Sequence, residues 1–384
     1  MQDWQNGGFG LYIHWPFCQS KCPYCDFNSH VSAQIDQKAW ETAYLSEIDR
    51  LAAQTEGRLL NTVFFGGGTP SLMSPDLVAT LIARIKTRWT PANDIEITLE
   101  ANPGSVEATR FRAFADAGVN RISMGIQALN DTDLKRLGRL HSASDARRAF
   151  DIARDAFARV SFDLIYARQH QTPDAWAKEL REALSMAVDH LSLYQLTIEQ
   201  GTAFGARHAA GGLQGLPEDE TAADMYLLTQ EICAAHDMPA YEISNHARDG
   251  AQSRHNLIYW RYGDYVGIGP GAHGRMTLGN TRIATQTPLM PQTWLDQVSQ
   301  LGHGELKRET IPTEEQALEY LMMSLRLREG TDIVRYQMLA GEALSDMRID
   351  DLEDQGFLTR NDTRIAATDT GRPVLNALIR AVML

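Results

Sequence analysis

The sequence contains few cysteines, a deficit of positive charge and no long apolar run. Four cysteines in 384 residues, three of them clustered, provide no disulfide framework and indicate a reducing compartment. The net charge of -13, from 36 basic and 49 acidic residues, argues against a nucleic-acid partner, because phosphates favour a basic surface. No apolar stretch approaches the ~20 residues of a membrane-spanning helix, and the first residues lack the features of a signal peptide. We therefore expect a cytoplasmic protein, with peripheral contact at a membrane left open.

Short apolar, β-branched runs recur along the first half of the chain and alternate with helix-like sequence. The runs cover residues 10–14, 62–65, 95–99, 121–124, 160–165 and 191–197, and the helix-like segments include residues 39–52 and 145–157. Such alternation predicts βα units and a parallel sheet. An eight-unit barrel takes ~250 residues, so six units take about 190, which matches this span. We predict an α/β fold with a partial (β/α)6 barrel, open on one side, whose functional groups lie at the carboxyl ends of the strands.

The remainder of the chain has a different pattern. Residues 241–245 are a candidate further strand, and a glycine-rich segment follows at 263–274. Helical patterns at 315–327, 352–357 and 371–382, with a hairpin near residues 361–362, predict a mostly helical, winged-helix-like C-terminal domain. The predicted division is a barrel over residues 1–240, a barrel extension over 241–312 and a small domain over 313–384.

Three cysteines form the strongest motif. Cys18, Cys22 and Cys25 have C-x3-C-x2-C spacing on a loop after the first predicted strand. A 4Fe-4S cluster takes four cysteine ligands in most proteins, so three close cysteines predict a cluster with one iron open to a small molecule.

Two other sites are compatible with the same residues. Cys22-Pro23-Tyr24-Cys25 alone resembles the dithiol of thioredoxin-like oxidoreductases, although that interpretation leaves Cys18 unexplained. Zinc is the other alternative, with His14 or His30 as the fourth ligand. We favour the cluster, because the glycine run at residues 66–68, after the second predicted strand, agrees with it. This run lacks the Lys-Ser/Thr that would make it a phosphate loop.

The cysteine and glycine motifs together resemble the radical SAM superfamily. Its members bind a 4Fe-4S cluster through C-x3-C-x2-C and S-adenosylmethionine on the open iron. The segments Leu-Tyr-Ile-His at 11–14, Phe-Gly-Gly-Gly-Thr-Pro-Ser at 65–71 and Glu-Ala-Asn-Pro-Gly at 100–104 are similar to the oxygen-independent coproporphyrinogen III oxidase group, and closest to its heme chaperone branch. The resemblance extends through nearly the whole chain and implies a radical SAM barrel.

The resemblance also implies a set of cofactor contacts. The turn after the second strand would face the methionine amino group, and Glu100 at the end of the third strand would pair with the ammonium or the ribose of S-adenosylmethionine. Each polar residue taken alone is more often a surface or capping residue, and the shared placement at strand ends favours a binding role. The implied contacts are Tyr12, Tyr24, Gly67, Gly68, Thr69, Glu100, Gln127, Arg139 and Asp163.

A second motif indicates heme. His255-Asn256-x-x-Tyr259-Trp260 matches the H-N-x-x-Y-W signature of the heme chaperone branch, and on a helix His255 and Tyr259 lie one turn apart. A neutral imidazole is a common axial ligand of heme iron, and flanking aromatic rings suit a macrocycle. The alternative is a buried histidine hydrogen-bonded beside core aromatics. His273 is a weaker heme candidate, and Cys233 has the pattern of a buried structural thiol.

Phe27 separates two functions within this resemblance. The decarboxylase carries a further cysteine two residues after the third, and this chain has Phe27 there. The leading hypothesis is a heme chaperone that delivers heme to heme-less acceptor proteins, with membrane respiratory enzymes as candidate acceptors and a cluster-dependent homodimer left open. The alternatives are an oxygen-independent coproporphyrinogen III dehydrogenase and a radical methylase or cyclopropanase on the same fold.

Overall fold

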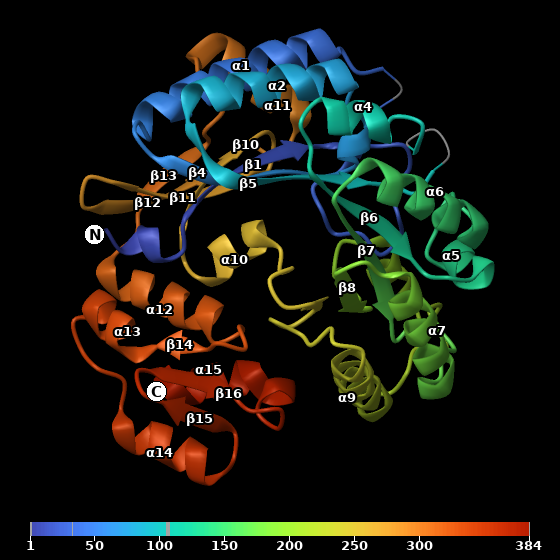
Figure 1. Cartoon of the computed structure of the whole chain (residues 1–384), viewed down its shortest axis with the longest axis vertical. Coiled ribbons are helices and arrows are strands. Elements are labelled where there is room, and N and C mark those ends of the chain that lie inside the picture. Colours follow the sequence, from blue (N-terminus) through green and yellow to red (C-terminus); the bar gives the residue numbers. More distant parts are fainter. Residues whose placement is uncertain (1, 33, 105–107, 384) are drawn as a thin grey trace.

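The computed structural model describes residues 2–32, 34–104 and 108–383. Within these residues, one curved sheet has eleven strands in the order β13-β12-β11-β10-β1-β4-β5-β6-β7-β8-β9 (Figure 1). The parallel strands of the barrel are β1 (Phe9–Trp15), β4 (Leu59–Gly67), β5 (Thr90–Ala101), β6 (Arg121–Gln127), β7 (Arg159–Tyr166) and β8 (His190–Gln195). The helices that follow these strands are α1 (Gln37–Gln54), α2 (Pro75–Arg88), α4 (Phe111–Asp116), α5 (Asp131–Arg136), α6 (Ala143–Ala156), α7 (Pro173–Met186), α8 (Ala203–Ala209) and α9 (Asp219–Ala235). The predicted partial (β/α)6 barrel is confirmed.

Burial on both faces explains why the barrel strands read as apolar runs. In β1, Leu11, Ile13 and Trp15 are fully buried, and the strand lies between β4 and β10 with parallel pairing to both. Parallel strands covered by helices on one side and facing the barrel interior on the other are buried on both faces, so even polar residues on them, such as Thr62 and Thr98, are shielded from solvent. The helices begin where the sequence supplies caps; Asp36, for example, accepts from two backbone N–H groups at the start of α1.

The segment after α9 extends the same sheet at both edges. β9 (Asn245–Ala247) pairs antiparallel with β8, and β10 (Asp264–Ile268) pairs parallel with β1. β11 (His273–Leu278), β12 (Thr281–Gln286) and β13 (Lys307–Thr310) continue antiparallel, and α11 (Pro291–Leu301) packs beside α1. α10 (Arg254–Trp260) lies on the concave side of the sheet (Figure 1).

The candidate strand at residues 241–245 begins later than predicted. Backbone N–H groups of Ile243 and Ser244 donate to the Glu242 carboxylate, which turns the chain, so the ladder starts at Asn245. The Glu242 carboxylate thus accepts hydrogen bonds from backbone N–H groups that, in a strand, would donate to the neighbouring strand.

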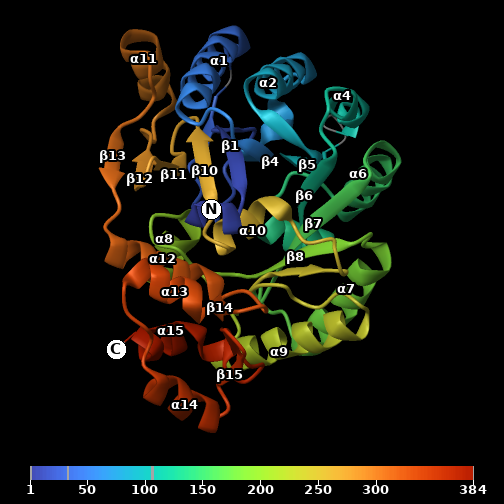
Figure 2. The same cartoon turned by 60° about the vertical axis from the view of Figure 1, so that its left-hand side comes forward.

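The C-terminal residues form a smaller unit with its own core (Figure 2). Its elements are α12 (Thr313–Ser324), β14 (Thr331–Asp332), α13 (Ile333–Ala340), α14 (Asp346–Asp354), β15 (Leu358–Asn361), β16 (Arg364–Ala367), the 3-10 helix η3 (Arg372–Val374) and α15 (Leu375–Met383). The three described strands pair in the order β14-β16-β15, and Leu321, Ile365 and Leu378 are buried between them and the helices. This is the mostly helical, winged-helix-like arrangement predicted. α14 ends at Asp354 rather than Phe357, because Gly356 adopts a left-handed backbone conformation (φ +77°).

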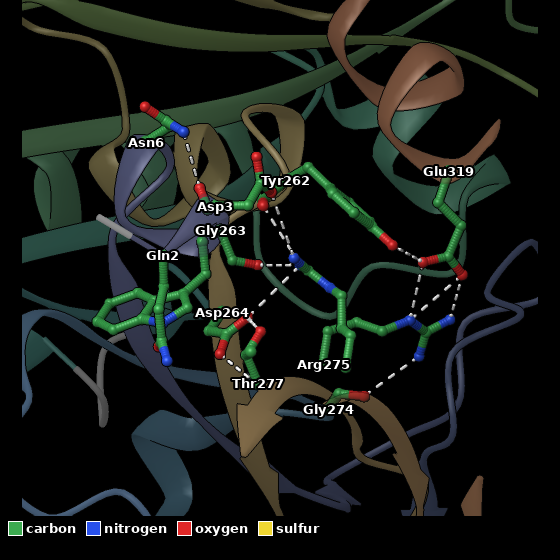
Figure 3. Close-up of polar contacts among 12 residues, drawn as sticks. Gln2, Asp3, Asn6, Tyr262, Gly263, Asp264, Gly274, Arg275, Thr277 and Glu319 are labelled. Carbon is green, nitrogen blue, oxygen red and sulfur yellow. Dashed lines mark hydrogen bonds and ion pairs between the residues drawn. The ribbon is translucent and has the colours of Figure 1, made fainter. Parts of the chain in front are cut away.

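A polar network joins this domain to the sheet. Figure 3 shows Tyr262 and Arg275 both reaching the Glu319 carboxylate on α12, at 2.7 Å from the Tyr262 hydroxyl and 2.8 Å from Arg275 Nη2. Arg335 on α13 pairs with Asp3 in the 3-10 helix η1 (Asp3–Asn6), at 2.7 Å from Nε to Oδ1, and it donates to the Arg261 carbonyl at 2.8 Å. The small domain is therefore fixed to both the amino-terminal residues and the end of α10.

Candidate functional site

A cavity of about 340 Å³ lies at the carboxyl ends of the parallel strands. Most of the residues that the sequence predicted as cofactor contacts share it: Cys18, Cys22, Tyr24, Cys25, Gly67, Gly68, Thr69, Glu100, Gln127, Arg139 and Asp163 all line its wall. Most of them come from the loop after β1 and from the carboxyl-terminal halves or ends of β4, β5, β6 and β7, and Arg139 comes from the segment between α5 and α6. Parallel strands bring their carboxyl ends to one edge, which is why residues far apart in sequence meet here.

The cysteine loop is held at both ends. Its first segment, β2 (Phe17–Cys18), pairs with β3 (His30–Val31), and His30 N–H donates to the Pro16 carbonyl at 2.7 Å. Asn28 donates to the carbonyls of Pro270 and Leu289, at 2.9 and 2.8 Å. The loop therefore projects three half-buried, unoxidised thiols into the cavity from a fixed frame.

The geometry of the loop disfavours the two alternative sites. Cys22 and Cys25 lie in a turn, with Cys25 N–H donating to the Cys22 carbonyl, and not at the helix start that lowers the pKa of a thioredoxin-like thiol. Among the described residues, no three His, Cys, Asp or Glu groups converge closely enough to hold a single metal ion. Both ring nitrogens of His14 are engaged, with the Tyr12 hydroxyl and the Asn28 carbonyl. A 4Fe-4S cluster bonds each thiolate through a different iron, so its ligands need not converge on one point.

Hydrogen-bond donors point at the cysteine sulfurs, which fits a negatively charged thiolate-bound cluster. Thr69 Oγ1 donates to Cys18 Sγ at 3.3 Å, and Arg139 Nη1 donates to Cys22 Sγ at 3.4 Å. Burial raises the pKa of the Cys18 and Cys25 thiols in the metal-free protein, and metal ligation stabilises the thiolate form against that burial.

The glycine turn lies against the strand that leads to the cysteines. Gly67 has φ +111°, and its N–H donates to Glu100 Oε2 at 3.2 Å. Thr69 N–H donates to the Phe17 carbonyl at 2.8 Å, one residue before Cys18. Glycine at 67 and 68 thus lets the backbone approach both the cysteine loop and the cavity.

Two carboxyl groups face the cavity from β5 and β7. Burial, followed by repulsion from Asp163, raises the pKa of Glu100 to about 8. Burial raises the pKa of Asp163 to about 6, against the opposing effects of Ser192 and Arg121. In the ligand-free protein Glu100 is therefore mostly protonated near neutral pH and Asp163 mostly ionised, and a bound cation would favour the ionised form of both.

These shifts predict a pH dependence of stability. Between about pH 6 and pH 8 the folded protein retains a proton on Glu100 that the unfolded chain has released, so the free energy of unfolding falls as pH rises. We expect the melting temperature of the ligand-free protein to decrease over this range and Glu100→Gln to reduce the decrease. Thermal unfolding followed by circular dichroism measures it, with the exposed Glu56→Gln as control. Equal slopes in Glu100→Gln and the wild type would contradict the assignment.

Two further predicted contacts, Gln127 and Tyr24, have distinct local surroundings. Gln127 lies in the cavity wall with a left-handed backbone (φ +73°), at a point where the pairing of β6 with β7 shifts register after Met124. Tyr24, inside the cysteine loop, packs near Phe204 of α8 at a ring separation of 6.4 Å.

His255, Tyr259 and Tyr12 form a separate group. None of the three is among the described residues that line the cavity. His255 is 1% exposed on α10, its Nδ1 contacts Thr62 Oγ1 and its Nε2 contacts the Tyr259 hydroxyl, each at 2.7 Å. The predicted one-turn spacing on a helix is confirmed, and both ring nitrogens are engaged. Burial lowers the pKa of His255 to about 3, so the imidazole is neutral. His273, the weaker heme candidate, is exposed at the start of β11.

Several cavity residues escaped the sequence analysis. Asn102, Gly125, His141 and Asp145 line the wall, and His141 Nε2 contacts the Ile126 carbonyl at 3.1 Å. Asn102 stands inside the Glu-Ala-Asn-Pro-Gly motif directly after β5, so its position at a strand end was the available signal.

Comparisons with known proteins agree with this geometry. Two family models match the chain: the Radical SAM superfamily over residues 12–183 and the HemN C-terminal domain over residues 311–374. The heme chaperone HemW of Escherichia coli strain K12 is 38% identical over 374 residues, covering 96% of this chain and 96% of that protein. The mitochondrial radical S-adenosyl methionine domain-containing protein 1 of Bos taurus is 38% identical over 384 residues, covering 97% of this chain and 87% of that protein. The structure of coproporphyrinogen III oxidase (HemN) from Escherichia coli matches with a TM-score of 0.81 at 21% identity, over 98% of this chain and 92% of that one, which shows a shared fold.

Proposed function

Because this chain belongs to the radical SAM superfamily, and within it to the family that contains the heme chaperone HemW, we propose that it is a heme chaperone that binds heme and passes it to acceptor proteins. The observation that carries the proposal is the extent of the similarity, which covers 96% of both this chain and the HemW of Escherichia coli. The match therefore includes the barrel, α10 and the small C-terminal domain.

We assign the cavity to a 4Fe-4S cluster and S-adenosylmethionine. Cys18, Cys22 and Cys25 would ligate the cluster, which supplies one-electron chemistry when bound. The turn at Gly67 to Thr69 and the Glu100 carboxyl would hold the amino-acid end of S-adenosylmethionine, since a buried carboxyl with raised pKa pairs favourably with an ammonium. Tyr24, Gln127, Arg139 and Asp163 complete the wall around this ligand.

We place heme contact at α10, with His255 as the candidate axial ligand and Tyr259 and Tyr12 beside it. The neutral imidazole supports this role, because only a deprotonated nitrogen ligates iron. His255 Nε2 shares a hydrogen bond with the Tyr259 hydroxyl, so ligation at that nitrogen requires the tyrosine to release it. Heme binding would therefore displace the Tyr259 side chain or move α10.

An anaerobic heme titration of the cluster-loaded protein, followed by absorbance, tests the function and the ligand together. We expect saturable, stoichiometric binding in the wild type and a lost or shifted Soret band in His255→Ala. His190→Ala is the matched control, because His190 is also buried and its Nε2 contacts a tyrosine hydroxyl, that of Tyr241, at 3.1 Å. Tyr259→Phe frees Nε2 without removing the imidazole and should preserve or strengthen binding.

The outcomes separate the site from the function. Unchanged spectra in His255→Ala would refute the axial ligand, and no saturable binding by the wild type would refute the chaperone. A chaperone must transfer heme as well as bind it, so transfer of heme to a heme-free acceptor protein is measured in the same samples. Absence of transfer would favour porphyrinogen chemistry, although Phe27, 62% exposed at the cavity, stands where the resemblance places a cysteine of the decarboxylase.

The acceptors and the assembly state belong to the same proposal. Within the part of the chain that the structure describes, no helix is long and apolar enough to cross a membrane. We propose a cytoplasmic protein that meets its acceptors, including membrane respiratory enzymes, at the membrane surface, and that forms a homodimer when the cluster is bound.

A further inference from the structure

A continuous run of hydrogen bonds connects the sulfurs of two cysteines through one asparagine. Asn102 Nδ2 donates to Thr69 Oγ1 at 3.2 Å, and Thr69 Oγ1 donates to Cys18 Sγ at 3.3 Å. On the other side, Arg139 Nη2 donates to Asn102 Oδ1 at 2.6 Å, and Arg139 Nη1 donates to Cys22 Sγ at 3.4 Å. The amide of Asn102 thus contacts Thr69 and Arg139, each of which donates to a cysteine sulfur.

The direction of each bond in this run is determined by chemistry. Arginine is only a donor, so the Asn102 atom that it meets must be the amide oxygen, and the amide nitrogen must face Thr69. The Thr69 oxygen accepts that N–H, which leaves its single hydroxyl hydrogen for Cys18 Sγ. At each end of the run, one hydrogen is therefore donated to a cysteine sulfur.

We propose that Asn102 is a positioning residue for the cluster, which orients the Thr69 hydroxyl and the Arg139 guanidinium toward Cys18 and Cys22 and so raises the reduction potential. This inference rests on the cluster assigned to the proposed function. Hydrogen bonds to cluster sulfurs and nearby positive charge stabilise the more negative, reduced state. Both donors lie in the wall of the cavity, where charge interactions are screened less than at a surface.

A second hydrogen bond of Arg139 shows how Asn102 helps to orient the guanidinium. Arg139 Nη2 also donates to the Gly125 carbonyl at 2.8 Å, and in the described residues its Nε has no hydrogen-bond partner. Gly125 and Asn102 belong to neighbouring parts of the sheet, within β6 and directly after β5, and together they fix the plane of the guanidinium. Removal of Asn102 takes away one of these two anchors, so the guanidinium can turn about the Gly125 carbonyl and away from Cys22.

The experiment is a potentiometric titration of the reconstituted cluster in the full-length protein, monitored by electron paramagnetic resonance. Asn102→Leu removes the amide at similar volume and without adding charge, and Thr69→Val removes only the hydroxyl. We expect each to reduce the ratio of reduced to oxidised cluster at a fixed potential about tenfold, equivalent to ~59 mV for a one-electron couple. Because Asn102 acts partly through Thr69, the shift in Asn102→Leu/Thr69→Val should be smaller than the sum of the two.

Asn28→Leu is the matched control. Asn28 also stabilises the cysteine loop, and its described side-chain hydrogen bonds are to the backbone carbonyls of Pro270 and Leu289 and to His30. We expect the midpoint of Asn28→Leu to equal that of the wild type. If Asn102→Leu does not retain the cluster, Asn102→Asp replaces it, because a carboxylate still accepts from Arg139 but draws the Thr69 hydroxyl away from Cys18.

Unchanged midpoints in the Asn102 and Thr69 variants, or an equal shift in Asn28→Leu, would overturn the inference while leaving the cluster assignment intact. Failure of the wild type to assemble a cluster would instead refute the cofactor assignment itself. Heme binding is measured by a different spectrum, so unchanged midpoint potentials would leave the proposed heme function untouched.

Discussion

Replacing any one of Cys18, Cys22 and Cys25 by alanine is expected to reduce the visible absorbance of the anaerobically reconstituted cluster to near zero. The three sulfurs are the thiol ligands that the cavity offers, and a cluster with two thiolates and two open irons is poorly retained. Iron and sulfide content, measured with absorbance on the same samples, gives the loss directly.

Cys233 provides the matched control. It lies on α9 in the hydrophobic core behind the barrel strands and is fully buried, so Cys233→Ala removes a thiol without touching the cavity. We expect Cys233→Ala to assemble the cluster at the wild-type level. Retention of the full absorbance by all three loop variants would show that the assignment is wrong.

The next largest expected effect comes from the glycine turn. A Cβ at Gly68 would lie 2.7 Å from the Phe17 carbonyl oxygen, and one at Gly67 would lie 2.6 Å from the His14 ring, in a backbone region that side chains rarely adopt. We expect Gly68→Ala to lower the free energy of unfolding by about 1–3 kcal/mol and to displace β2, which carries Cys18. Because this Cβ would contact backbone atoms of Phe17, no side-chain rotation relieves the contact.

The readouts for this prediction are thermal unfolding, cluster occupancy and S-adenosylmethionine affinity by equilibrium dialysis. Gly57→Ala is the control, since Gly57 has positive φ (+77°), and among the described residues no heavy atom lies within 4 Å of the point where its Cβ would stand. Gly57→Ala measures the cost of alanine in a left-handed backbone, a cost that Gly68→Ala does not carry, so a loss of cluster confined to Gly68→Ala comes from the contact with the cysteine loop. Equal losses of cluster in Gly57→Ala and Gly68→Ala would contradict the proposed coupling.

The barrel was predictable because its strands carry a local signal. Parallel strands buried on both faces read as short apolar runs, and six such runs with helices between them permit few arrangements. The strands at the sheet edges were less predictable. β9 begins only after Glu242 has turned the chain, and this depends on side-chain bonds that no periodicity reports.

The candidate site likewise contains residues that could be predicted from the sequence and residues that could not. The cysteines are recognisable because their spacing follows from the chemistry of the cluster, and the glycine turn and Glu100 because they belong to motifs that resemble the radical SAM superfamily. Asn102 contacts Thr69 and Arg139 across long sequence separations, so its role appears only in three dimensions. His255 shows the opposite case, because the motif identified the residue but not that its two nitrogens are already engaged.

The position of β1 has a consequence for how the protein is made. β1 is an inner strand with β4 on one side and β10, which starts at Asp264, on the other. Asn28 in the cysteine loop likewise forms its hydrogen bonds to the carbonyls of Pro270 and Leu289 only after those residues have been synthesised. A strand synthesised early therefore obtains its last neighbours only after some 250 further residues have left the ribosome, a separation that follows from the numbering of β1 and β10. Iron and sulfide must then be inserted after translation has passed this point, into a loop completed by segments from distant parts of the chain.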